Sequence, residues 1–260
     1  MGKILPIGLA LAITAAWLAP APGIWVDNLG IIPYLIVAVF VANGYQINLR
    51  QRPQGRELLT ASVSVSVINL VVAPVLGFWF ASLLSLSPGA TLGLVVMTAM
   101  PTTLSSAIVL TGVAGGDLLW ALLLTVILNI LGVLTIPITV PWLLSLGGGI
   151  DIDGFTLFKN LVLLALIPFA AGQIIRRIVG PGKWQPLLKY GPTCCIISMV
   201  WMTMARSAEA LTDLAISTIV LAAIGSLAVH ALLLGGCLAA ARGIGLPARA
   251  VPAYVLTGSQ

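Results

Sequence analysis

Long apolar runs separated by short polar connections are the feature that most constrains this chain. Eight such runs and part of a ninth lie at roughly 4–19, 30–46, 60–86, 89–113, 118–146, 155–179, 190–209, 212–241 and from 247 onward. A helix needs about 20 apolar residues to cross the hydrocarbon core of a bilayer. Only 7% of the 260 residues are charged, whereas about a quarter are charged in an ordinary soluble domain. We therefore expect an all-α polytopic membrane protein whose partner is the lipid bilayer.

The lysines and arginines are divided unevenly between the two sides of the membrane that these runs define. If the N-terminus is cytoplasmic, ten of the twelve face the cytoplasm, and Lys159 and Arg206 face outward. Cytoplasmic loops carry such an excess of positive charge. The distribution predicts a multi-pass protein of the plasma (inner) membrane with a cytoplasmic N-terminus. Because topology accounts for the net charge of +5, we expect no nucleic-acid partner.

One stretch interrupts the fourth run with groups that a lipid-facing helix does not tolerate. PTTLSSA, residues 101–107, places a proline and four hydroxyls between the apolar segments GLVVMTAM and IVLTGVAG. Proline removes a helical hydrogen bond, and lipid offers no replacement. One interpretation is a proline kink whose hydroxyls bond back to the preceding turn. The other is a broken helix at a midplane binding site, as in secondary transporters.

A second segment resembles this one and favours the transporter interpretation. With an offset of 159 residues, SPGATLGLVVMTAMP at 87–101 aligns with LPARAVPAYVLTGSQ at 246–260, and TGSQ falls opposite TAMP. By the count of positive charges, the two segments enter the membrane from opposite sides. Similar segments of opposite orientation are typical of an inverted repeat.

Signatures of membrane enzymes and metal centres are missing from the sequence. It has no G-x-S-x-G, P-loop or H-E-x-x-H motif, and Cys194, Cys195 and Cys237 lack metal-ligand spacing. His230, the only histidine, lies within a run near Ser226. A hydrogen bond between helices or a proton-transfer role would fit it there. We expect a protein that is not an enzyme and uses no cofactor.

Several motifs follow one another in a characteristic order: PVLGF, LSP, MPTTLSSAIVLTGVAGGD, LLTVILNILGVLTIP and VLTGSQ. This order resembles the bile acid:sodium symporter superfamily, especially its bacterial branch similar to sodium/bile acid cotransporter 7. The resemblance implies inverted five-helix repeats with broken, crossing helices, of which eight spans and part of a ninth are present. It implies a panel domain in 1–59 and 148–210. The core domain would comprise 60–147, broken at 101–107, and 211–260, which stops at the second break.

The same resemblance implies where a coupling ion and a substrate would bind. Sodium would be held by residues around the two breaks: Asn69, Ser105, Ser106, Thr125, Asn129 and Gln260. The substrate cavity would be lined by Thr102, Thr103, His230, Thr257 and Ser259. Relatives that transport bile acids have an asparagine and a glutamate where this chain has Ala107 and Leu256. A sodium ion would therefore rely on neutral oxygens or on the charge of the substrate.

Three functions are compatible with this pattern. The first is secondary active transport, as sodium-coupled symport of a small organic anion by alternating access. The second is a proton-coupled or uncoupled carrier on the same fold, which would keep its activity when choline replaces sodium. The third is a regulatory membrane protein that does not transport. The substrate and the oligomeric state are left open.

The repeat also predicts that the protein continues beyond Gln260. The first repeat extends to about Leu146, and the offset of 159 places the matching end at about residue 305. We therefore expect roughly 45 further residues that complete the crossover and add a tenth helix.

Overall fold

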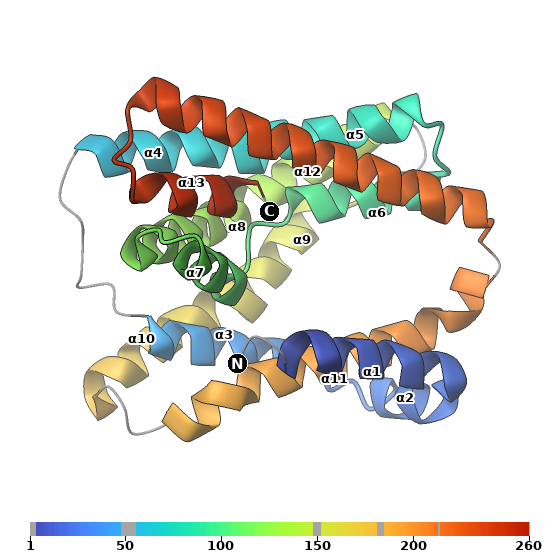
Figure 1. Ribbon diagram of the computed structural model, residues 1–260. Coiled ribbons are helices and arrows are strands. Elements are labelled where there is room, and N and C mark those ends of the chain that lie inside the picture. Colours follow the sequence, from blue (N-terminus) through green and yellow to red (C-terminus); the bar gives the residue numbers. More distant parts are fainter. Residues whose placement is uncertain (1–3, 48–55, 148–151, 181–184, 213, 260) are drawn as a thin grey trace. The chain divides into compact units, whose positions relative to one another are not determined.

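The computed structural model describes residues 4–47, 56–147, 152–180, 185–212 and 214–259. Within these ranges the regular elements are all helices (Figure 1), which confirms the expected all-α class. The chain divides into two compact units. Unit 1 combines Met1–Asn48 with Asn160–Ala215, and unit 2 combines Leu49–Lys159 with Ile216–Gln260.

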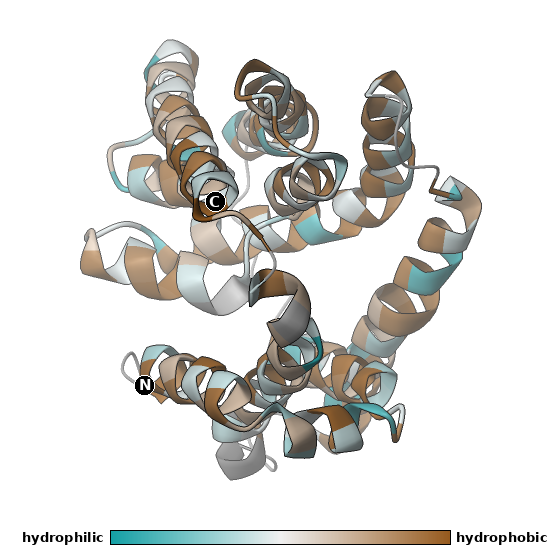
Figure 2. Ribbon diagram, turned by 90° about the vertical axis from the view of Figure 1, so that its right-hand side faces the viewer, coloured by the Kyte–Doolittle hydropathy of each residue, from teal (hydrophilic) through white to brown (hydrophobic). Residues whose placement is uncertain are grey.

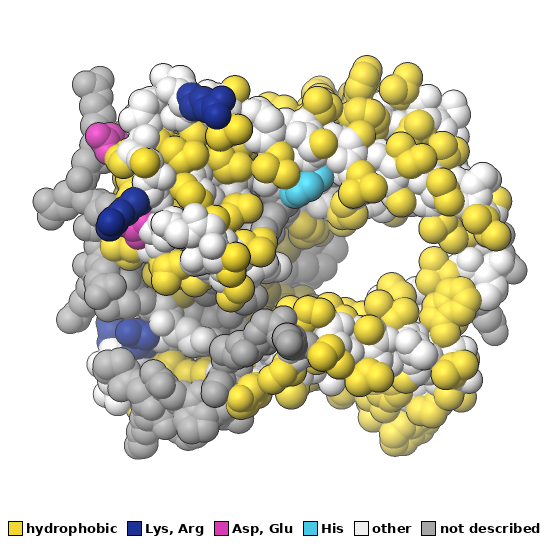
Figure 3. All heavy atoms as spheres, viewed as in Figure 1, with side chains coloured by type: hydrophobic (Ala, Val, Ile, Leu, Met, Phe, Trp, Pro, Cys, Tyr) yellow, Lys and Arg dark blue, Asp and Glu magenta, His cyan; other side chains and the backbone are white. Residues whose placement is uncertain are grey.

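Apolar helices long enough to cross a bilayer occur in the described part of the chain. Four helices meet the requirement alone: Glu57–Leu83, Leu118–Leu146, Gly154–Val179 and Ile216–Ile244. The pair Ile4–Leu18 and Pro20–Asp27, bent by 102°, would be a fifth span, and Ile32–Gln46 and Pro88–Ala99 are shorter apolar helices. Hydrophobic residues occupy most of the helices (Figure 2) and most of the face seen in Figure 3. The chain is a multi-pass membrane protein, but fewer than the eight expected spans meet these requirements within the described residues.

Unit 1 contains two helices that approach each other closely. Its elements are α1 (Ile4–Leu18), α2 (Pro20–Asp27), α3 (Ile32–Gln46), η2 (Val162–Leu166), α10 (Ile167–Val179) and α11 (Gln185–Thr212). α11 packs against α1, α2 and α3, and α10 packs against α3. A Cβ added to Gly172 of α10 would lie 2.2 Å from the carbonyl oxygen of Val41, and one on Gly44 of α3 would lie 2.1 Å from that of Phe169. Glycine at both positions lets the two backbones touch.

The helix α2 was not expected from the sequence, which indicated one run at 4–19 followed by a connection. The helix restarts because Pro20 at its first position needs no N–H partner and already has a helical φ. Ala19, which precedes this proline, has an extended backbone with φ −145° and ψ 79°, as expected before proline. The chain therefore leaves the helical conformation only at Ala19, where it turns sharply before the helix restarts.

Side chains of α10 satisfy the last carbonyls of α3. The amide nitrogen of Gln173 donates to the carbonyls of Gly44 (2.6 Å) and Ile47 (3.0 Å). Arg176 donates to the carbonyls of Tyr45 (2.7 Å) and Gln46 (3.0 Å). The final turn of a helix leaves these carbonyls without intrahelical partners. The C-terminal ends of α3 and α10 thus lie on the same side of unit 1, as two spans that run in the same direction require.

An ion pair joins α2 to α11 in the same unit. Arg206 donates to the carboxylate of Asp27, whose side chain is 8% exposed, while the arginine side chain is 66% exposed. The charge distribution in the sequence predicts that Arg206 lies on the outer side. Its contact with Asp27 in the structure requires that both residues lie on one side of the membrane.

Unit 2 is arranged around the long helix α8. Its elements are α4 (Arg56–Val67), η1 (Ile68–Val72), α5 (Ala73–Leu83), α6 (Pro88–Ala99), α7 (Leu104–Val113), α8 (Leu118–Leu146), α9 (Gly154–Leu161), α12 (Ile216–Ile244) and α13 (Ala250–Gly258). α9 continues into η2 and so connects the two units in sequence. Buried side chains of α4, η1, α8, α12 and α13 form one core, which includes Val65, Leu70, Leu128, Cys237 and Tyr254.

The two π-helical turns, η1 and η2, each end directly before a proline-containing helix. The N–H of Ala73 bonds to the carbonyl of Ile68, and that of Ile167 bonds to the carbonyl of Val162, each five residues back. The next residues, Pro74 and Pro168, cannot donate a hydrogen bond, and a proline ring crowds the carbonyl four residues before it. A widened π turn relieves this crowding without ending the helix.

The interruption predicted at 101–107 is present but shorter. α6 ends at Ala99, and α7 begins at Leu104. Met100 and Thr103 on its two sides have extended backbones, with ψ of 129° and 139°. Proline biases the preceding residue toward this conformation, so Met100 leaves the helix. Residues 104–107 already belong to α7, so the non-helical stretch ends at Thr103. A helix can begin there because its first N–H groups need no partner within the helix.

The end of α7 is attached to the beginning of α13. Gly115 turns the chain with a φ of +69°, a conformation that favours glycine. The N–H of Asp117 then donates to the carbonyl of Arg249 at 2.7 Å, and the Asp117 carboxylate accepts from the N–H of Leu119 at the start of α8. A backbone hydrogen bond therefore links the turn after α7 to the residue that precedes α13.

Candidate functional site

Asn129 of α8 connects the helix to the first break. Its amide nitrogen donates to the carbonyl of Thr102 at 3.1 Å and to that of Thr125, one turn earlier, at 2.8 Å. Because carbonyls only accept, this end of the amide must be the NH₂ group. The amide oxygen therefore points away from both carbonyls.

The hydroxyl-bearing residues of the first break form a local network. The hydroxyls of Thr103 and Ser106 lie 2.5 Å apart, and Ser106 also donates to the carbonyl of Thr103 at 3.1 Å. Thr102 is buried, and Thr103 is exposed. The predicted ligand Ser105 belongs to α7, but its side chain lies outside the described residues. Ala107 is fully buried.

Asn69 connects the π turn η1 to the second break. It is fully buried, and its amide nitrogen donates to the carbonyl of Gly258 at 3.3 Å. Gly258 ends α13 in a tight space, since an added Cβ would lie 2.6 Å from Cγ2 of Val65 and 2.7 Å from Sγ of Cys237. The predicted ligand Gln260 lies outside the described residues.

His230 of α12 also contacts the second break. Its Nδ1 lies 2.6 Å from the carbonyl oxygen of Ser259, so Nδ1 carries the hydrogen. His230 is exposed, whereas Thr257 and Ser259 are buried. Of the residues expected in the substrate cavity, the structure thus brings His230 to Ser259 and Thr102 to Asn129.

Three buried hydroxyls near these breaks have no hydrogen-bond partner among the described residues: Thr125, Thr257 and Ser259. Thr125 lies on α8, whose Leu124 and Leu128 belong to the same core as Leu70 of η1 and Val255 of α13. Elsewhere on α8, Thr135 and Thr139 bond back to carbonyls four residues earlier. An unpartnered buried hydroxyl costs about 1–3 kcal/mol. Among the described residues, nothing takes up the hydrogen-bonding capacity of these three oxygens.

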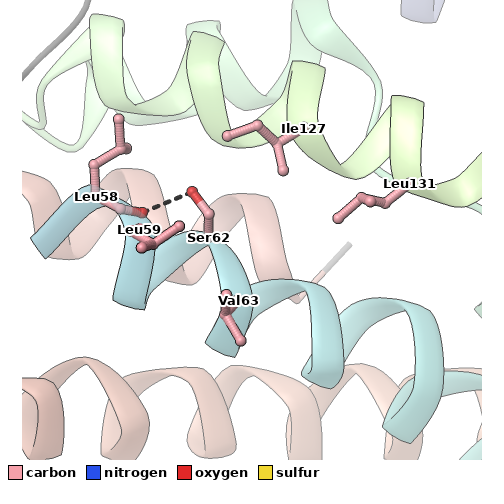
Figure 4. A pocket seen from close by; sticks show the side chains of 6 residues that line it. All are labelled: Leu58, Leu59, Ser62, Val63, Ile127 and Leu131. Atoms are coloured by element: carbon pink, nitrogen blue, oxygen red, sulfur yellow. Dashed lines mark hydrogen bonds between the residues drawn. The ribbon is translucent and has the colours of Figure 1, made fainter. Parts of the chain in front are cut away.

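A hollow of unit 2 that lies elsewhere is apolar. It measures about 350 Å³ and is lined by Leu58, Leu59, Ser62 and Val63 of α4 and by Ile127 and Leu131 of α8 (Figure 4). The hydroxyl of Ser62 donates to the carbonyl of Leu58 at 2.7 Å. The hollow therefore offers no free polar group, and its chemistry suits a lipid chain rather than an ion.

Several features of the site were not expected from the sequence. These are the π turn that carries Asn69, the use of amide nitrogens as donors to the breaks, and Thr111. Thr111 of α7 is fully buried, and its hydroxyl lacks a partner within the described residues. The proline after η1 was the available signal for the π turn, and Thr111 could have been noticed as a polar residue inside the apolar run that follows the first break.

The described residues around the breaks offer neutral oxygens rather than a cluster of carboxylates, thiols and imidazoles. No group of three or more His, Cys, Asp or Glu residues that could hold a metal occurs in the part of the chain that the structure describes. The available ligands are neutral hydroxyl, amide and carbonyl oxygens. Such oxygens suit a hard cation better than a transition metal.

Comparisons with known proteins agree with this chemistry. A model of the SBF-like CPA transporter family matches residues 3–260. The chain is 28% identical over 230 residues to the Arabidopsis thaliana chloroplast protein named "Probable sodium/metabolite cotransporter BASS4". The aligned region covers 86% of this chain and 52% of that protein. It is 27% identical over 205 residues to sodium/bile acid cotransporter 7-A of Xenopus laevis, and the aligned region covers 76% of this chain and 59% of that protein.

A bacterial relative is also similar to the chain. Uncharacterized protein PA2026 of Pseudomonas aeruginosa is 27% identical over 189 residues, with 70% of this chain and 54% of that protein covered. The chain spans about half the length of the curated relatives it matches. The family match over nearly the whole chain confirms the resemblance found in the motifs. The chain belongs to the SBF-like CPA transporter family, a family of membrane transporters and not of enzymes.

Proposed function

We propose that this chain acts in sodium-coupled symport of a small organic anion by alternating access. The observation that carries the proposal is the set of buried hydroxyls without partners around the breaks, on Thr125, Thr257 and Ser259. A protein retains such groups at a cost in stability, and a bound cation would offset that cost. Relatives named as sodium cotransporters support sodium as this cation.

The proposed sodium ligands are the residues that the resemblance implied. Asn69, Ser106, Thr125 and Asn129 would contribute together with Ser105 and Gln260. The nitrogens of Asn69 and Asn129 donate to carbonyls at the two breaks, and their amide oxygens would bind the ion. No carboxylate is among these six residues, so the negative charge of the substrate would balance the ion.

The start of α7 supports an anionic substrate. α7 begins at Leu104, directly after the break, and its N-cap residue Thr103 makes no capping bond with its side chain. The N–H groups of a first helical turn carry a partial positive charge and attract anions. Thr102, Thr103, His230, Thr257 and Ser259 would line the cavity that receives the anion.

The alternating-access mechanism would use unit 1 as the panel domain and unit 2 as the core domain of an inverted-repeat transporter. One observation supports the repeat. The offset of 159 places Glu57–Leu83 on 216–242, and α12 runs over Ile216–Ile244. The broken segment α6–α7 follows the first of these runs, and α13 follows the second.

The sodium site predicts an unusual pair of effects for Thr125→Val in the full-length protein. Valine has nearly the same shape but lacks the unpartnered hydroxyl, so the sodium-free melting temperature should stay the same or rise. In a protein that binds the ion, a concentration 100 times the Kd stabilises the native state by about 2.7 kcal/mol. In Thr125→Val this sodium-dependent stabilisation should disappear. Melting in sodium against choline measures both effects.

Thr135→Val is the matched control, because this hydroxyl on the same helix is satisfied by Leu131. It should keep the full sodium response. If Thr125→Val keeps the response as well, Thr125 is not a ligand. If the wild-type protein transports equally in sodium and choline, the carrier is proton-coupled or uncoupled.

The proposed orientation, with a cytoplasmic N-terminus in the inner membrane, predicts a labelling pattern. Asn28 and Ile178 are exposed near the ends of α2 and α10. In a background without native cysteines, Asn28→Cys should react with an impermeant thiol reagent in intact cells. Ile178→Cys should react only after the cells are opened. The reverse pattern would invert the orientation.

A further inference from the structure

Side chains from continuous helices hold the backbone at both breaks. Asn129 donates to the carbonyl of Thr102, and Asn69 donates to that of Gly258. His230 makes the third such bond, to the carbonyl of Ser259. All three acceptors lie in the break or at the C-terminal end of a half-helix, where carbonyls lack helical partners. The three donors therefore fix the direction of these peptide groups.

The bond from His230 is the shortest of the three, at 2.6 Å. The carbonyl oxygen cannot donate, so a hydrogen on Nδ1 is required whether the ring is neutral or charged. The bond joins α12 to the residue that follows α13, across 29 positions in sequence. In Figure 3 the ring (cyan) is visible at the surface, so the contact to the break is made from an exposed position.

Among the described residues, the elements packed against α12 offer His230 no ionic partner near its ring. α5, α6 and η1, which pack against α12, contain no titratable side chain, and α13 contributes only Tyr254. On α4 the titratable residues are Arg56 and Glu57, at its first turn. On α12 itself, Cys237 and Arg242 lie about two and three turns further along. The carbonyl of Ser259 is thus the contact that fixes the ring.

We propose that His230 is a positioning residue for the second break. Its Nδ1–H holds the peptide group of Ser259 in one direction, and this keeps the hydroxyls of Thr257 and Ser259 buried and unpartnered, ready for a ligand. Without the donor, the end of α13 can rotate, and these hydroxyls can turn to other acceptors. The inference rests on the proposed function for the identity of that ligand, but the positioning itself does not depend on transport.

The test is the local accessibility of the break in the full-length protein. Ser259→Cys is placed in a background in which the three native cysteines are alanine, and its reaction with a small membrane-permeant maleimide is followed. The side chain of Ser259 is 1% exposed, so labelling should be slow. His230→Ala should accelerate it roughly five- to tenfold, the factor by which a lost hydrogen bond shifts a local opening equilibrium.

His230→Asn provides the rescue. The amide nitrogen of asparagine can take the place of Nδ1, so labelling should return to within about twofold of the parent rate. Ser226→Ala, one turn earlier on α12, should have no effect. Val95→Cys, fully buried in α6, reports general loosening and should label at the same rate in all variants.

Each outcome decides between the two proposals. The positioning role would be overturned if His230→Ala labels at the parent rate, or if labelling accelerates at both Ser259→Cys and Val95→Cys. It would also be overturned if His230→Asn fails to restore the rate. Sodium-dependent stabilisation is measured in parallel, with Ser259 intact. If labelling behaves as expected but no variant, including wild type, responds to sodium, the positioning role stands and the proposed function fails.

Discussion

Gly172→Ala should destabilise the protein strongly, because its new methyl group would meet the backbone of α3. The added Cβ would lie 2.2 Å from the carbonyl oxygen of Val41 and 2.8 Å from the nitrogen of Tyr45. Neither atom can move like the end of a flexible side chain, so α10 must shift away from α3. Such overpacking costs about 3 kcal/mol. A shift would also stretch the bonds from Gln173 and Arg176 to the last carbonyls of α3.

The expected result is a fall in melting temperature of roughly 6–12 °C for a chain of this size. Gly191→Ala, in α11 of the same unit, is the matched control, because a Cβ there meets nothing within 4 Å. Alanine favours a helix over glycine by about 1 kcal/mol, so this control should melt at the same temperature or slightly higher. A similar loss in both variants would show that the close approach of α3 and α10 is not what Gly172 provides.

Gly258→Ala should strongly weaken the response to sodium. The new methyl group would lie 2.6 Å from Cγ2 of Val65 and 2.7 Å from Sγ of Cys237, so the end of α13 must move away from α4 and α12. That movement would separate the carbonyl of Gly258 from the amide of Asn69 and displace the hydroxyls of Thr257 and Ser259. Melting in sodium against choline should show at least a tenfold weaker apparent affinity.

Two further variants make this result specific. Gly236→Ala, in α12 of the same unit, has open space around its Cβ and should retain the sodium response. Adding Cys237→Ala to Gly258→Ala removes one of the two crowding atoms and should recover part of the response, since neighbouring residues that share a contact are not additive. Full sodium affinity in Gly258→Ala would contradict the placement of the ion near the end of α13.

The features that could be predicted from the sequence depend only on residues that lie close together along the chain. The apolar run at 118–146 coincides with α8, Leu118–Leu146, and the run at 155–179 corresponds to Gly154–Val179. The break after Met100 was also predictable, because proline prevents the helix from continuing whatever surrounds it. The helix α2 and the π turns were not predicted, since proline can start a new helix or widen a turn as well as end a helix.

The sequence by itself determined that this chain is an all-α membrane protein with a helix broken at Pro101, because apolarity, charge asymmetry and proline act locally and need no tertiary context. Only the tertiary structure decided which groups meet at the breaks. The bonds from Asn129 to Thr102, from His230 to Ser259 and from Asn69 to Gly258 span 27, 29 and 189 positions. Which hydroxyls remain without a partner follows from these contacts, because a hydroxyl buried by packing can bond only to the groups that the fold brings to it.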